Sequence, residues 1–584
     1  MARTIADQLV AQLIDAGVDH IYGIVGDSLN PIVDAVRRSG GKANGGIDWI
    51  HVRHEEAAAF MAAAEAQLTG KLAVCAGSCG PGNLHLINGL FDAHRSKAPV
   101  LAIASHIPSA EIGSGYFQET HPERLFVECS NYCEQIATAT QSPRVVNSAI
   151  RHATTGPGVS VVVISGDIAE FDATDGFPAY VPTATPTLVP AETDVRALAD
   201  AINAAKNVAI FAGAGVEGAH DAVIAFAEHV KAPIGHSLRG KQWIQYDNPY
   251  DIGMTGLLGY GAAHAGIHDA DLLLLLGTDF PYEQFLPDAG KVVIGQIDTD
   301  ASHLGRRVSV AHPVHGDVRA TLLMLTGLVK PKKSRTFLDR MLKKHEKLLG
   351  SVVGTYTDVD TVKPIHPEYA ISVIDDATAA DAIFTADTGM GNVWQARYVT
   401  PGPDRRIIGS FIHGSMANAL PHAIGAQVAY PGRQVVAIAG DGGLSMLLGE
   451  LITAAAYRLP VKVFVFNNST LGLVKLEMLV NGFPDFGVDV PGVDYAGIAT
   501  AIGFHAVRVE DPKLLQASVA NALAHDGPAL VDIVTDSRAL SLPPAITGEQ
   551  VKGFALAMSK IVLTGGGAEA VAMARSNIRH LPGL

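Results

Sequence analysis

Short runs of apolar residues, separated by segments with helical periodicity, constrain the fold of this chain more than any other feature. Such runs stand at 208–211, 272–276 and 435–439, and a fourth, interrupted by one lysine, stands at 461–466. They lack the polar alternation of strands with one solvated face, so they predict strands that are buried on both sides. Helices between such strands provide the crossover connections that a parallel sheet requires. The sequence therefore predicts an α/β protein built from doubly wound parallel sheets.

Three such sheet domains are predicted, followed by a C-terminal helical tail. Residues 171–195 are rich in Pro, Thr and Ala without periodicity, which is typical of a linker. A second boundary follows Pro331, where two lysines precede a charged helix at 335–349. The expected domains are 1–182, 183–340 and 341–540, and the expected tail is 541–584.

Composition and charge exclude several classes of protein. The 43 basic and 58 acidic residues give a net charge of −15, which argues against a general nucleic-acid binder. The four cysteines are too few for a disulfide-stabilised secreted scaffold. Asp7 and Asp15 interrupt the N-terminal apolar pattern and exclude a signal peptide, and no apolar run approaches the ~18 residues of a membrane span. We expect a cytoplasmic protein that is soluble or attached to a membrane surface.

The strongest chemical signal is a pair of polar turns that follow two predicted strands. Asp441 lies between two glycines after the strand at 435–439, and Asn468 follows the strand at 461–466, 27 residues after Asp441. One right-handed strand–helix–strand crossover places both side chains at the carboxyl edge of a parallel sheet. With the backbone carbonyl of Thr470 they offer hard oxygen ligands for Mg²⁺ or Ca²⁺. Either turn alone is more typical of a helix cap or a loop, but the pair favours a metal that holds a diphosphate.

Two further segments lie where predicted strands meet helices. Glu55, in Arg53-His-Glu-Glu56, is explained either as a first-turn residue favoured by the helix dipole or as a desolvated acid that exchanges a proton with a heterocyclic nitrogen. The loop at 77–83 contains three glycines and predicts a backbone that lies against a ligand. It is not a P-loop, because no Gly-Lys-Ser/Thr follows.

These four segments, in this order, resemble the thiamine-diphosphate enzymes of the pyruvate oxidase and acetolactate synthase group. They read RHEE at 53–56, GSCGPGN at 77–83, GDGG at 440–443 and FNNS at 466–469. Longer stretches are similar to the flavin-dependent, acetate-forming pyruvate:quinone oxidoreductases within this group. These stretches are 84–92, 112–122, 246–256, 277–282 and 413–418. The resemblance extends over nearly the whole chain and implies a pyrimidine-binding, an FAD-binding and a diphosphate-binding domain.

The resemblance assigns roles around thiamine diphosphate to individual residues. Glu55 would bond the aminopyrimidine ring and promote loss of the thiazolium proton, and Met416 would fold the cofactor into a V. Asp441, Asn468 and the Thr470 carbonyl would hold Mg²⁺ on the diphosphate. The predicted thiamine-diphosphate contacts are Glu55, Gly80, His413, Gly414, Ser415, Met416, Asp441, Gly442, Gly443, Asn468, Leu471, Gly472, Leu473 and Val474.

The resemblance also predicts substrate and flavin contacts. Phe117, Gln118 and His121 match the stretch that lines the substrate pocket, although His121 is equally typical of a surface loop. Leu473 departs from the group, in which an aromatic residue linked to electron transfer often occupies this position. These four residues, with Glu55 and Met416, form the predicted catalytic set. The predicted FAD contacts are Gly213, Gly215, Arg239, Thr255, Gly256, Leu257, Leu258, Thr278, Asp279, Phe280, Pro281, Tyr282, Asp298 and Asp317.

The activity that the resemblance implies is oxidative decarboxylation of pyruvate to acetate and CO₂. Electrons of a thiamine-bound enamine would pass through FAD to a membrane quinone. Three alternatives stay open. They are a carboligase of the acetolactate or glyoxylate type with structural FAD, a phosphate-dependent pyruvate oxidase that reduces oxygen, and a non-catalytic FAD-binding membrane scaffold.

The tail has two predicted helices, at 552–563 and 568–581. In the second helix apolar residues share one face and arginines lie opposite. The apolar face comprises Val571, Ala574, Ile578 and Leu581. This pattern alone favours a helix docked on its own protein, whereas the resemblance implies a releasable amphipathic segment that binds the inner face of the cell membrane. The resemblance also implies a homotetramer, because the group places its cofactor between two chains.

Overall fold

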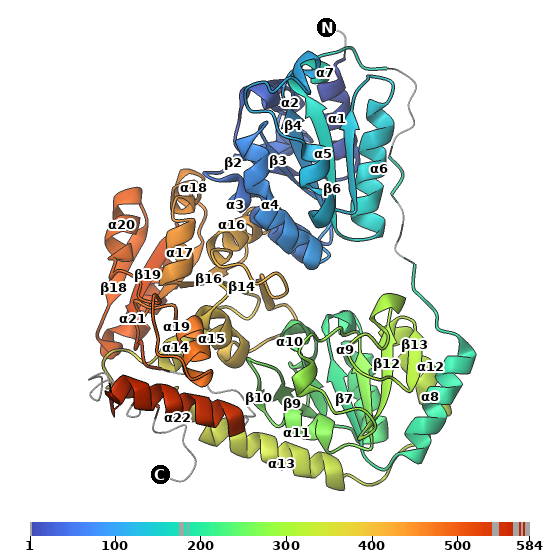
Figure 1. The fold of residues 1–584 in the computed structure, drawn as a ribbon, viewed down its shortest axis with the longest axis vertical. Coiled ribbons are helices and arrows are strands. Elements are labelled where there is room, and N and C mark those ends of the chain that lie inside the picture. The colour runs from blue at the N-terminus through green and yellow to red at the C-terminus, as the bar shows by residue number, and fades with distance from the viewer. Residues whose placement is uncertain are drawn as a thin grey trace.

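The computed structural model describes residues 3–174, 180–182, 184, 186–539, 548–563, 571–573 and 576–577. Three α/β lobes follow one another along the chain, and a last helix lies beside the third lobe (Figure 1). Each lobe contains its own sheet. The predicted fold class, three parallel-sheet domains with a helical tail, is therefore confirmed.

The first domain has an entirely parallel, six-stranded sheet in the order β2-β1-β3-β4-β6-β5. Its strands are β1 (His20–Gly23), β2 (Asp48–His51), β3 (Ala73–Gly77), β4 (Val100–His106), β5 (Tyr132–Ile136) and β6 (Val159–Ser165). Its α-helices are α1 (Ile5–Asp15), α2 (Asn30–Ser39), α3 (Glu55–Thr69), α4 (Pro81–Arg95), α5 (Pro122–Leu125), α6 (Ser142–Thr155) and α7 (Gly166–Ala169). Thr4 and Asp7 form a reciprocal capping box that fixes the start of α1.

The middle domain has a seven-stranded sheet in the order β10-β9-β8-β7-β11-β12-β13. Its strands are β7 (Val208–Ala212), β8 (Ile234–His236), β9 (Asp251–Met254), β10 (Tyr260–Gly261), β11 (Leu272–Leu276), β12 (Val293–Asp298) and β13 (His312–His315). Its α-helices are α8 (Glu192–Ala204), α9 (His220–Val230), α10 (Leu238–Ile244), α11 (Ala263–His268), α12 (Val318–Leu328) and α13 (Thr336–Ser351). One edge departs from the parallel pattern, because β10 pairs with β9 in the antiparallel sense. The predicted boundary at residue 340 falls inside α13, which packs against β9 and β10.

The third domain has a six-stranded parallel sheet in the order β15-β14-β16-β17-β19-β18. Its strands are β14 (Ile383–Ala386), β15 (Arg406–Gly409), β16 (Val435–Gly440), β17 (Lys462–Asn467), β18 (His505–Val509) and β19 (Ala529–Val534). Its α-helices are α14 (Pro367–Ala377), α15 (Met390–Tyr398), α16 (Ala419–Ala429), α17 (Asp441–Met446), α18 (Glu450–Ala456), α19 (Gly472–Val480), α20 (Tyr495–Ile502) and α21 (Pro512–Ala524).

The first and third domains share one hydrophobic core through α3 and α16. Seven of the fifteen residues of α3 are alanine, and the helix is buried on nearly every side. At the crossing point Gly425 of α16 lies against the backbone of Met61, where an added Cβ would be 2.3 Å from the Met61 carbonyl oxygen. Small side chains thus let the two helices approach closely, and the core continues from one sheet to the other.

The tail helix α22 (Gly548–Leu563) is docked on the third domain. Ala557 of α22 and the nearby Met573 are buried together with Leu476 and Leu479 of α19, and the Lys560 ammonium donates to the Gly482 carbonyl at 2.9 Å. Of the second predicted tail helix, 568–581, only 571–573 and 576–577 lie within the described part of the chain, so its predicted apolar face is mostly outside it. None of the helices in the described residues is both long and apolar enough to cross a membrane.

Candidate active site and cofactor-binding regions

Two neighbouring strands of the third domain bring Asp441 and Asn468 to the same sheet edge. β16 and β17 pair in parallel, with Gly440 opposite Phe466. Asp441 begins α17 directly after β16, and its Oδ2 accepts a hydrogen bond from the backbone amide of Ser469 at 2.7 Å. The two turns that the sequence singles out therefore contact one another.

A cavity of about 240 Å³ opens at this edge. Eleven residues expected at the cofactor line it: Gly414, Met416, Asp441, Gly442, Gly443, Asn468, Thr470, Leu471, Gly472, Leu473 and Val474. Carboxylate, amide and carbonyl oxygens thus meet a wall that is otherwise mostly glycine and aliphatic side chains. Among the described residues, every member of the lining belongs to the third domain.

The donor set of this cavity fits Mg²⁺ on a diphosphate. Asp441 is buried, and burial raises the pKa of its carboxyl to about 6, although the amides of Gly442 and Ser469 favour the charged form. A carboxylate desolvated in this way gains from a bound cation. The side-chain oxygen of Asn468 and the carbonyl of Thr470 are further hard donors in the same lining. Gly442 and Gly443 line the cavity at the start of α17, and backbone amides at the start of a helix are suited to bind a phosphate.

The structure adds a segment to the cavity that the sequence reasoning missed. Asp387, Thr388, Gly389 and Met390 follow β14 and line it. Asp387 Oδ1 accepts a hydrogen bond from the Ala419 amide at 2.9 Å, and burial raises the pKa of its carboxyl to about 6. The available signal was the Asp-Thr-Gly turn at 387–389, which follows β14 much as the Gly-Asp-Gly turn at 440–442 follows the strand at 435–439.

Glu55 lies in the first domain and outside this lining. It is the first residue of α3 and is 7% exposed. Its Oε2 lies 2.9 Å from Nδ1 of His85, a residue that the sequence analysis did not select. Gly82 faces its other oxygen, since a Cβ there would be 3.1 Å from Oε1. Glu55 is thus a nearly buried carboxyl with an oriented imidazole partner.

His54, Glu55 and His85 bring three potential metal ligands within 4.8 Å of one another. The two imidazole rings are stacked, with centroids 4.4 Å apart and planes 25° apart. The lone pair of a ring nitrogen lies in the ring plane, so nearly parallel stacked rings cannot both aim at one ion at the ~2.0 Å that zinc requires. We therefore assign no metal to this cluster.

Two other predicted cofactor contacts, His413 and Ser415, face the first domain of the same chain. The amide of Asn88 in α4 donates to Ser415 Oγ at 2.9 Å and to Glu56 Oε1 at 2.7 Å. Its oxygen lies 2.8 Å from His413 Nε2. These residues therefore form a polar contact between the domains.

The predicted substrate residues lie on a loop of the first domain. Gly80 packs on this loop, since a Cβ there would be 2.8 Å from the Gln118 carbonyl oxygen, and the Cys79 thiol donates to Gln118 Oε1 at 3.3 Å. Phe117 is 76% exposed. His121 is exposed beside Glu123. The loop at 77–83 and the substrate loop thus meet, whereas His121 has the surface position that was its alternative.

The glycines of the predicted FAD site hold two loops of the middle domain together. An added Cβ at Gly213 would lie 2.4 Å from the Gly277 carbonyl oxygen, and one at Gly215 would lie 2.6 Å from the Gly277 Cα. The loops after β7 and β11 can therefore touch only because neither carries a side chain at these points. Thr278 and Asp279 follow directly on this contact.

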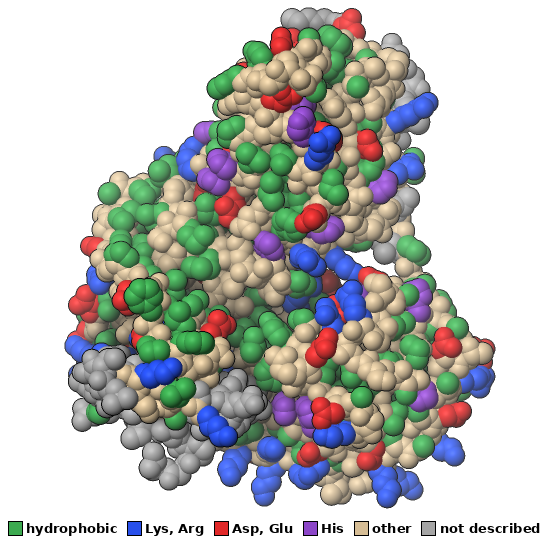
Figure 2. Space-filling view, viewed as in Figure 1, with side chains coloured by type: hydrophobic (Ala, Val, Ile, Leu, Met, Phe, Trp, Pro, Cys, Tyr) green, Lys and Arg blue, Asp and Glu red, His purple; other side chains and the backbone are tan. Residues whose placement is uncertain are grey.

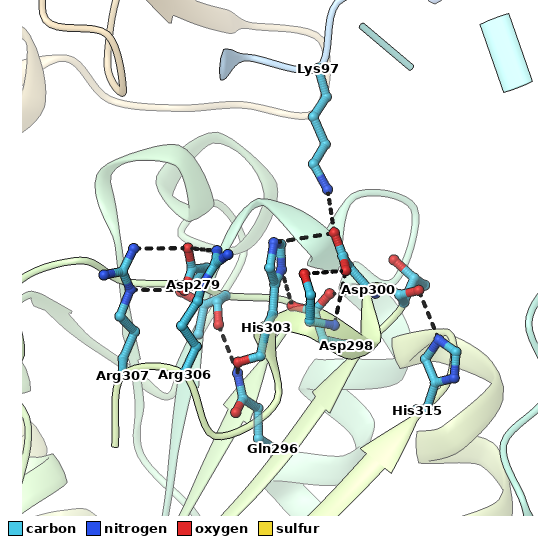
Figure 3. Close-up of polar contacts among 12 residues, drawn as sticks. Lys97, Asp279, Gln296, Asp298, Asp300, His303, Arg306, Arg307 and His315 are labelled. Carbon is cyan, nitrogen blue, oxygen red and sulfur yellow. Dashed lines mark hydrogen bonds and ion pairs between the residues drawn. The ribbon is translucent and has the colours of Figure 1, made fainter. Parts of the chain in front are cut away.

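Charged residues cluster beside these loops at the carboxyl edge of β12 (Figure 3). Both Arg306 and Arg307 pair with Asp279; burial alone would raise the pKa of that carboxyl, but the hydrogen bonds from the two arginines hold it below its ordinary value. His303 lies 3.2 Å from Asp298. The cluster is therefore held in place by its own ion pairs.

The remaining predicted FAD contacts have mixed environments. The Thr255 hydroxyl is buried and forms no hydrogen bond within the described part of the chain, so it could serve a ligand. Asp317 instead caps α12, accepting from the Ala320 amide at 2.8 Å. Arg239 is partly buried, and its guanidinium donates to the Ser96 carbonyl of the first domain at 3.4 Å. Of the others, Gly256 packs on Phe280, Leu257 and Tyr282 are exposed, and Leu258 and Pro281 lie in the same loops.

A hollow between the first and middle domains adjoins this region, and Lys and Arg side chains gather around it (Figure 2). Lys97 of the first domain crosses to Asp300 of the middle domain, with Nζ 3.2 Å from Oδ2 (Figure 3). Cationic groups beside a domain interface suit a ligand that carries phosphates.

Comparison with known proteins agrees with this geometry. Three family models match: the thiamine pyrophosphate enzyme N-terminal TPP binding domain at 3–125, the central domain at 195–325 and the C-terminal TPP binding domain at 387–533. The chain is 35% identical to protein YdaP of Bacillus subtilis (strain 168) over 96% of each chain. The chain belongs to the thiamine pyrophosphate enzymes.

Within this family, its relatives include a pyruvate oxidase and an acetolactate synthase. It is 32% identical to the pyruvate oxidase of Lactiplantibacillus plantarum, over 92% of this chain and 89% of that protein. It is 31% identical to the acetolactate synthase large subunit of Parasynechococcus marenigrum (strain WH8102), over 90% and 86%. This thiamine pyrophosphate enzyme therefore has the three domains of its family, and its C-terminal match includes the 240 Å³ cavity.

Proposed function

We propose that this thiamine pyrophosphate enzyme oxidatively decarboxylates pyruvate to acetate and CO₂ and passes the electrons through FAD to a membrane quinone. One observation carries the proposal: an oxygen-donor cavity suited to Mg²⁺ and a diphosphate coexists with a second, phosphate-compatible region in the middle domain. A pyruvate oxidase among the relatives supports the choice of substrate.

Each predicted site residue would have a separate role at the cofactor. Asp441, Asn468 and the Thr470 carbonyl would hold Mg²⁺, and Glu55 would exchange a proton with the aminopyrimidine ring of thiamine diphosphate. When bound, the thiazolium supplies an electron sink for decarboxylation. Met416, from the aliphatic wall, would orient the cofactor and exclude water from the reacting atoms.

The position of Glu55 supports an oligomer, with a homotetramer as the proposed form. Glu55 does not line the cavity of its own third domain in the described structure. Phe117, which lies like Glu55 in the first domain, on the predicted substrate loop, is largely exposed. A second copy would bring these residues to the cavity of its partner and would cover the exposed aromatic side chain.

We further propose that the tail attaches the enzyme to the inner face of the cell membrane, where quinone resides. Release of α22 from α19 would expose the apolar residues that it buries against Leu476 and Leu479. Lys343, Lys344 and Lys347 of α13 are exposed. α13 and α22 lie at the bottom of the molecule in Figure 1, where Figure 2 shows a row of Lys and Arg side chains. Deleting the residues after 544 should abolish activation by lipid vesicles while sparing reduction of a soluble dye; unchanged activation would contradict this role.

An anaerobic titration with pyruvate tests the reaction itself. We expect the bound flavin to bleach only when thiamine diphosphate and Mg²⁺ are both present, and acetate and CO₂ to appear in equal amounts. A flavin that stays oxidised while acetolactate accumulates would instead identify a carboligase, the alternative supported by the acetolactate synthases among the relatives. If oxygen reoxidises the reduced flavin and quinone does not, the enzyme is an oxygen-reducing oxidase.

A further inference from the structure

We propose that Glu450 is a positioning residue for Glu55: from the third domain, it holds the backbone at which α3 begins. The inference rests on the proposed proton exchange between Glu55 and the aminopyrimidine ring. Glu450 is the first residue of α18 and is 1% exposed. Such a buried carboxylate must be compensated by hydrogen bonds, and its partners identify what it supports.

The outer edge of β2 shows where α18 acts. β2 is an edge strand, so alternate backbone groups on its outer side have no partner in the sheet. The Tyr457 hydroxyl accepts from the His51 amide at 2.7 Å and donates to the Trp49 carbonyl at 3.3 Å. Two residues further, the Arg53 amide donates to Glu450 Oε1 at 2.9 Å. Residues at and just beyond α18 therefore close this edge up to the point at which the chain turns into α3.

Glu450 is itself fixed at both oxygens. The Thr453 hydroxyl donates to its Oε2 at 2.7 Å, within the first turn of α18. Burial raises the pKa of its carboxyl, while the Thr453 hydroxyl and the amides of Arg53 and His54 favour the charged form. One oxygen is thus anchored to α18 and the other to the segment before α3. Removing this acceptor would leave a backbone amide unpaired between the two domains.

Glu55 stands two residues after Arg53. The position of the backbone at Arg53 therefore determines where the Glu55 carboxyl lies. Its Oε2 is directed at His85 by a contact of 2.9 Å, and the opposite side is closed by Gly82. A displacement of about 1 Å at a reacting group can cost roughly 100-fold in rate. Glu450 also lies nine residues after Asp441 on one continuous segment. The same segment therefore carries a predicted Mg²⁺ ligand at one end and the support of the predicted acid at the other.

The variants Glu450→Ala and Glu450→Gln test this role, with Glu55→Gln as the reference for loss of the acid and Tyr457→Phe as the matched control. Tyr457→Phe removes a hydroxyl from the same edge but leaves Arg53 bound. The first readout is hydrogen–deuterium exchange at C2 of bound thiamine diphosphate, measured by quench and NMR in the holoenzyme. The second is amide exchange of the peptide 49–58 in protein without cofactor, measured by mass spectrometry.

We expect Glu450→Ala to slow C2 exchange between about tenfold and 100-fold and to speed amide exchange at 53–56. Glu450→Gln keeps one acceptor oxygen and should fall between wild type and Glu450→Ala in both readouts. Tyr457→Phe should speed amide exchange near His51 and leave C2 exchange unchanged. If Glu450→Ala does not fold, the test rests on Glu450→Gln. Wild-type rates of both C2 exchange and amide exchange in Glu450→Gln would overturn the proposal.

Two further outcomes are decisive. Tyr457→Phe and Glu450→Ala could slow C2 exchange equally. The rate would then depend on the whole outer edge of β2 rather than on Glu450, and the positioning role would be overturned. Wild-type C2 exchange in folded Glu450→Ala, with slow exchange in Glu55→Gln, would refute the positioning role and leave the proposed function intact. Wild-type protein that exchanges C2 no faster than Glu55→Gln would refute the proposed role of Glu55 itself.

Discussion

Replacing Gly443 by alanine should damage the diphosphate cavity by direct collision. Gly443 lies in α17, and a Cβ at this position would be 2.3 Å from Asp387 Oδ2 and 2.7 Å from its Cγ. Such contacts require a shift of about 1 Å to reach ordinary packing distance. Asp387 has little freedom to move, because it is 3% exposed and its two oxygens accept from the amides of Ala419 and Gly440.

The expected cost of Gly443→Ala combines overpacking with a lost hydrogen bond. Overpacking a dense site costs about 1–3 kcal/mol, and leaving a buried amide unpaired costs about 1–3 kcal/mol. We therefore expect the free energy of unfolding to fall by about 2–5 kcal/mol and the affinity for thiamine diphosphate to drop at least about tenfold. Urea denaturation and isothermal titration calorimetry measure the two effects.

A control and a double variant make this prediction sharp. Gly432→Ala adds the same methyl group where no atom lies within 4 Å, and it should change neither quantity. Asp387→Ala removes the colliding atoms, so Gly443→Ala should cost less in that background by at least about 1 kcal/mol. If Gly443→Ala costs no more than Gly432→Ala, or the same in both backgrounds, the collision argument is wrong.

Three further predictions concern the metal, the pH dependence of stability and the domain contact. Asp441→Ala should weaken Mg²⁺-dependent binding of thiamine diphosphate more than about 100-fold in calorimetry, and an unchanged Mg²⁺ requirement would exclude Asp441 as a ligand. Burial lowers the pKa of His236 to about 4 from 6.5; the unfolded chain therefore binds the proton more readily, and stability is lost as pH falls below 6.5. This loss reaches about 2 kcal/mol at pH 5 and should be absent in His236→Gln; equal urea midpoint shifts between pH 7 and pH 5 in both proteins would refute it. Gly425→Ala should push α16 off α3 and lower the thermal midpoint by several degrees, whereas a wild-type midpoint would show that the crossing can relax.

The sequence by itself determined the sheets and one edge of the active site. The strand at 272–276 has the predicted bounds, because an unbroken apolar run between polar turns predicts a strand that is buried on both faces. Asp441 and Asn468 could be placed together because the handedness of strand crossovers is nearly invariant. Both inferences use local pattern and a general rule of chain topology.

Only the tertiary structure decided which distant surfaces meet. Asp387 joins the cavity through the neighbouring β14, the apolar face of α22 docks on α19, and Glu450 reaches Arg53 across 397 residues of chain. These contacts depend on the shapes of packed helices, such as the glycine that lets α16 approach α3. A sequence pattern records that a face is apolar or that a carboxyl is buried, but the partner is chosen by the fit of surfaces that exist only after the domains have folded.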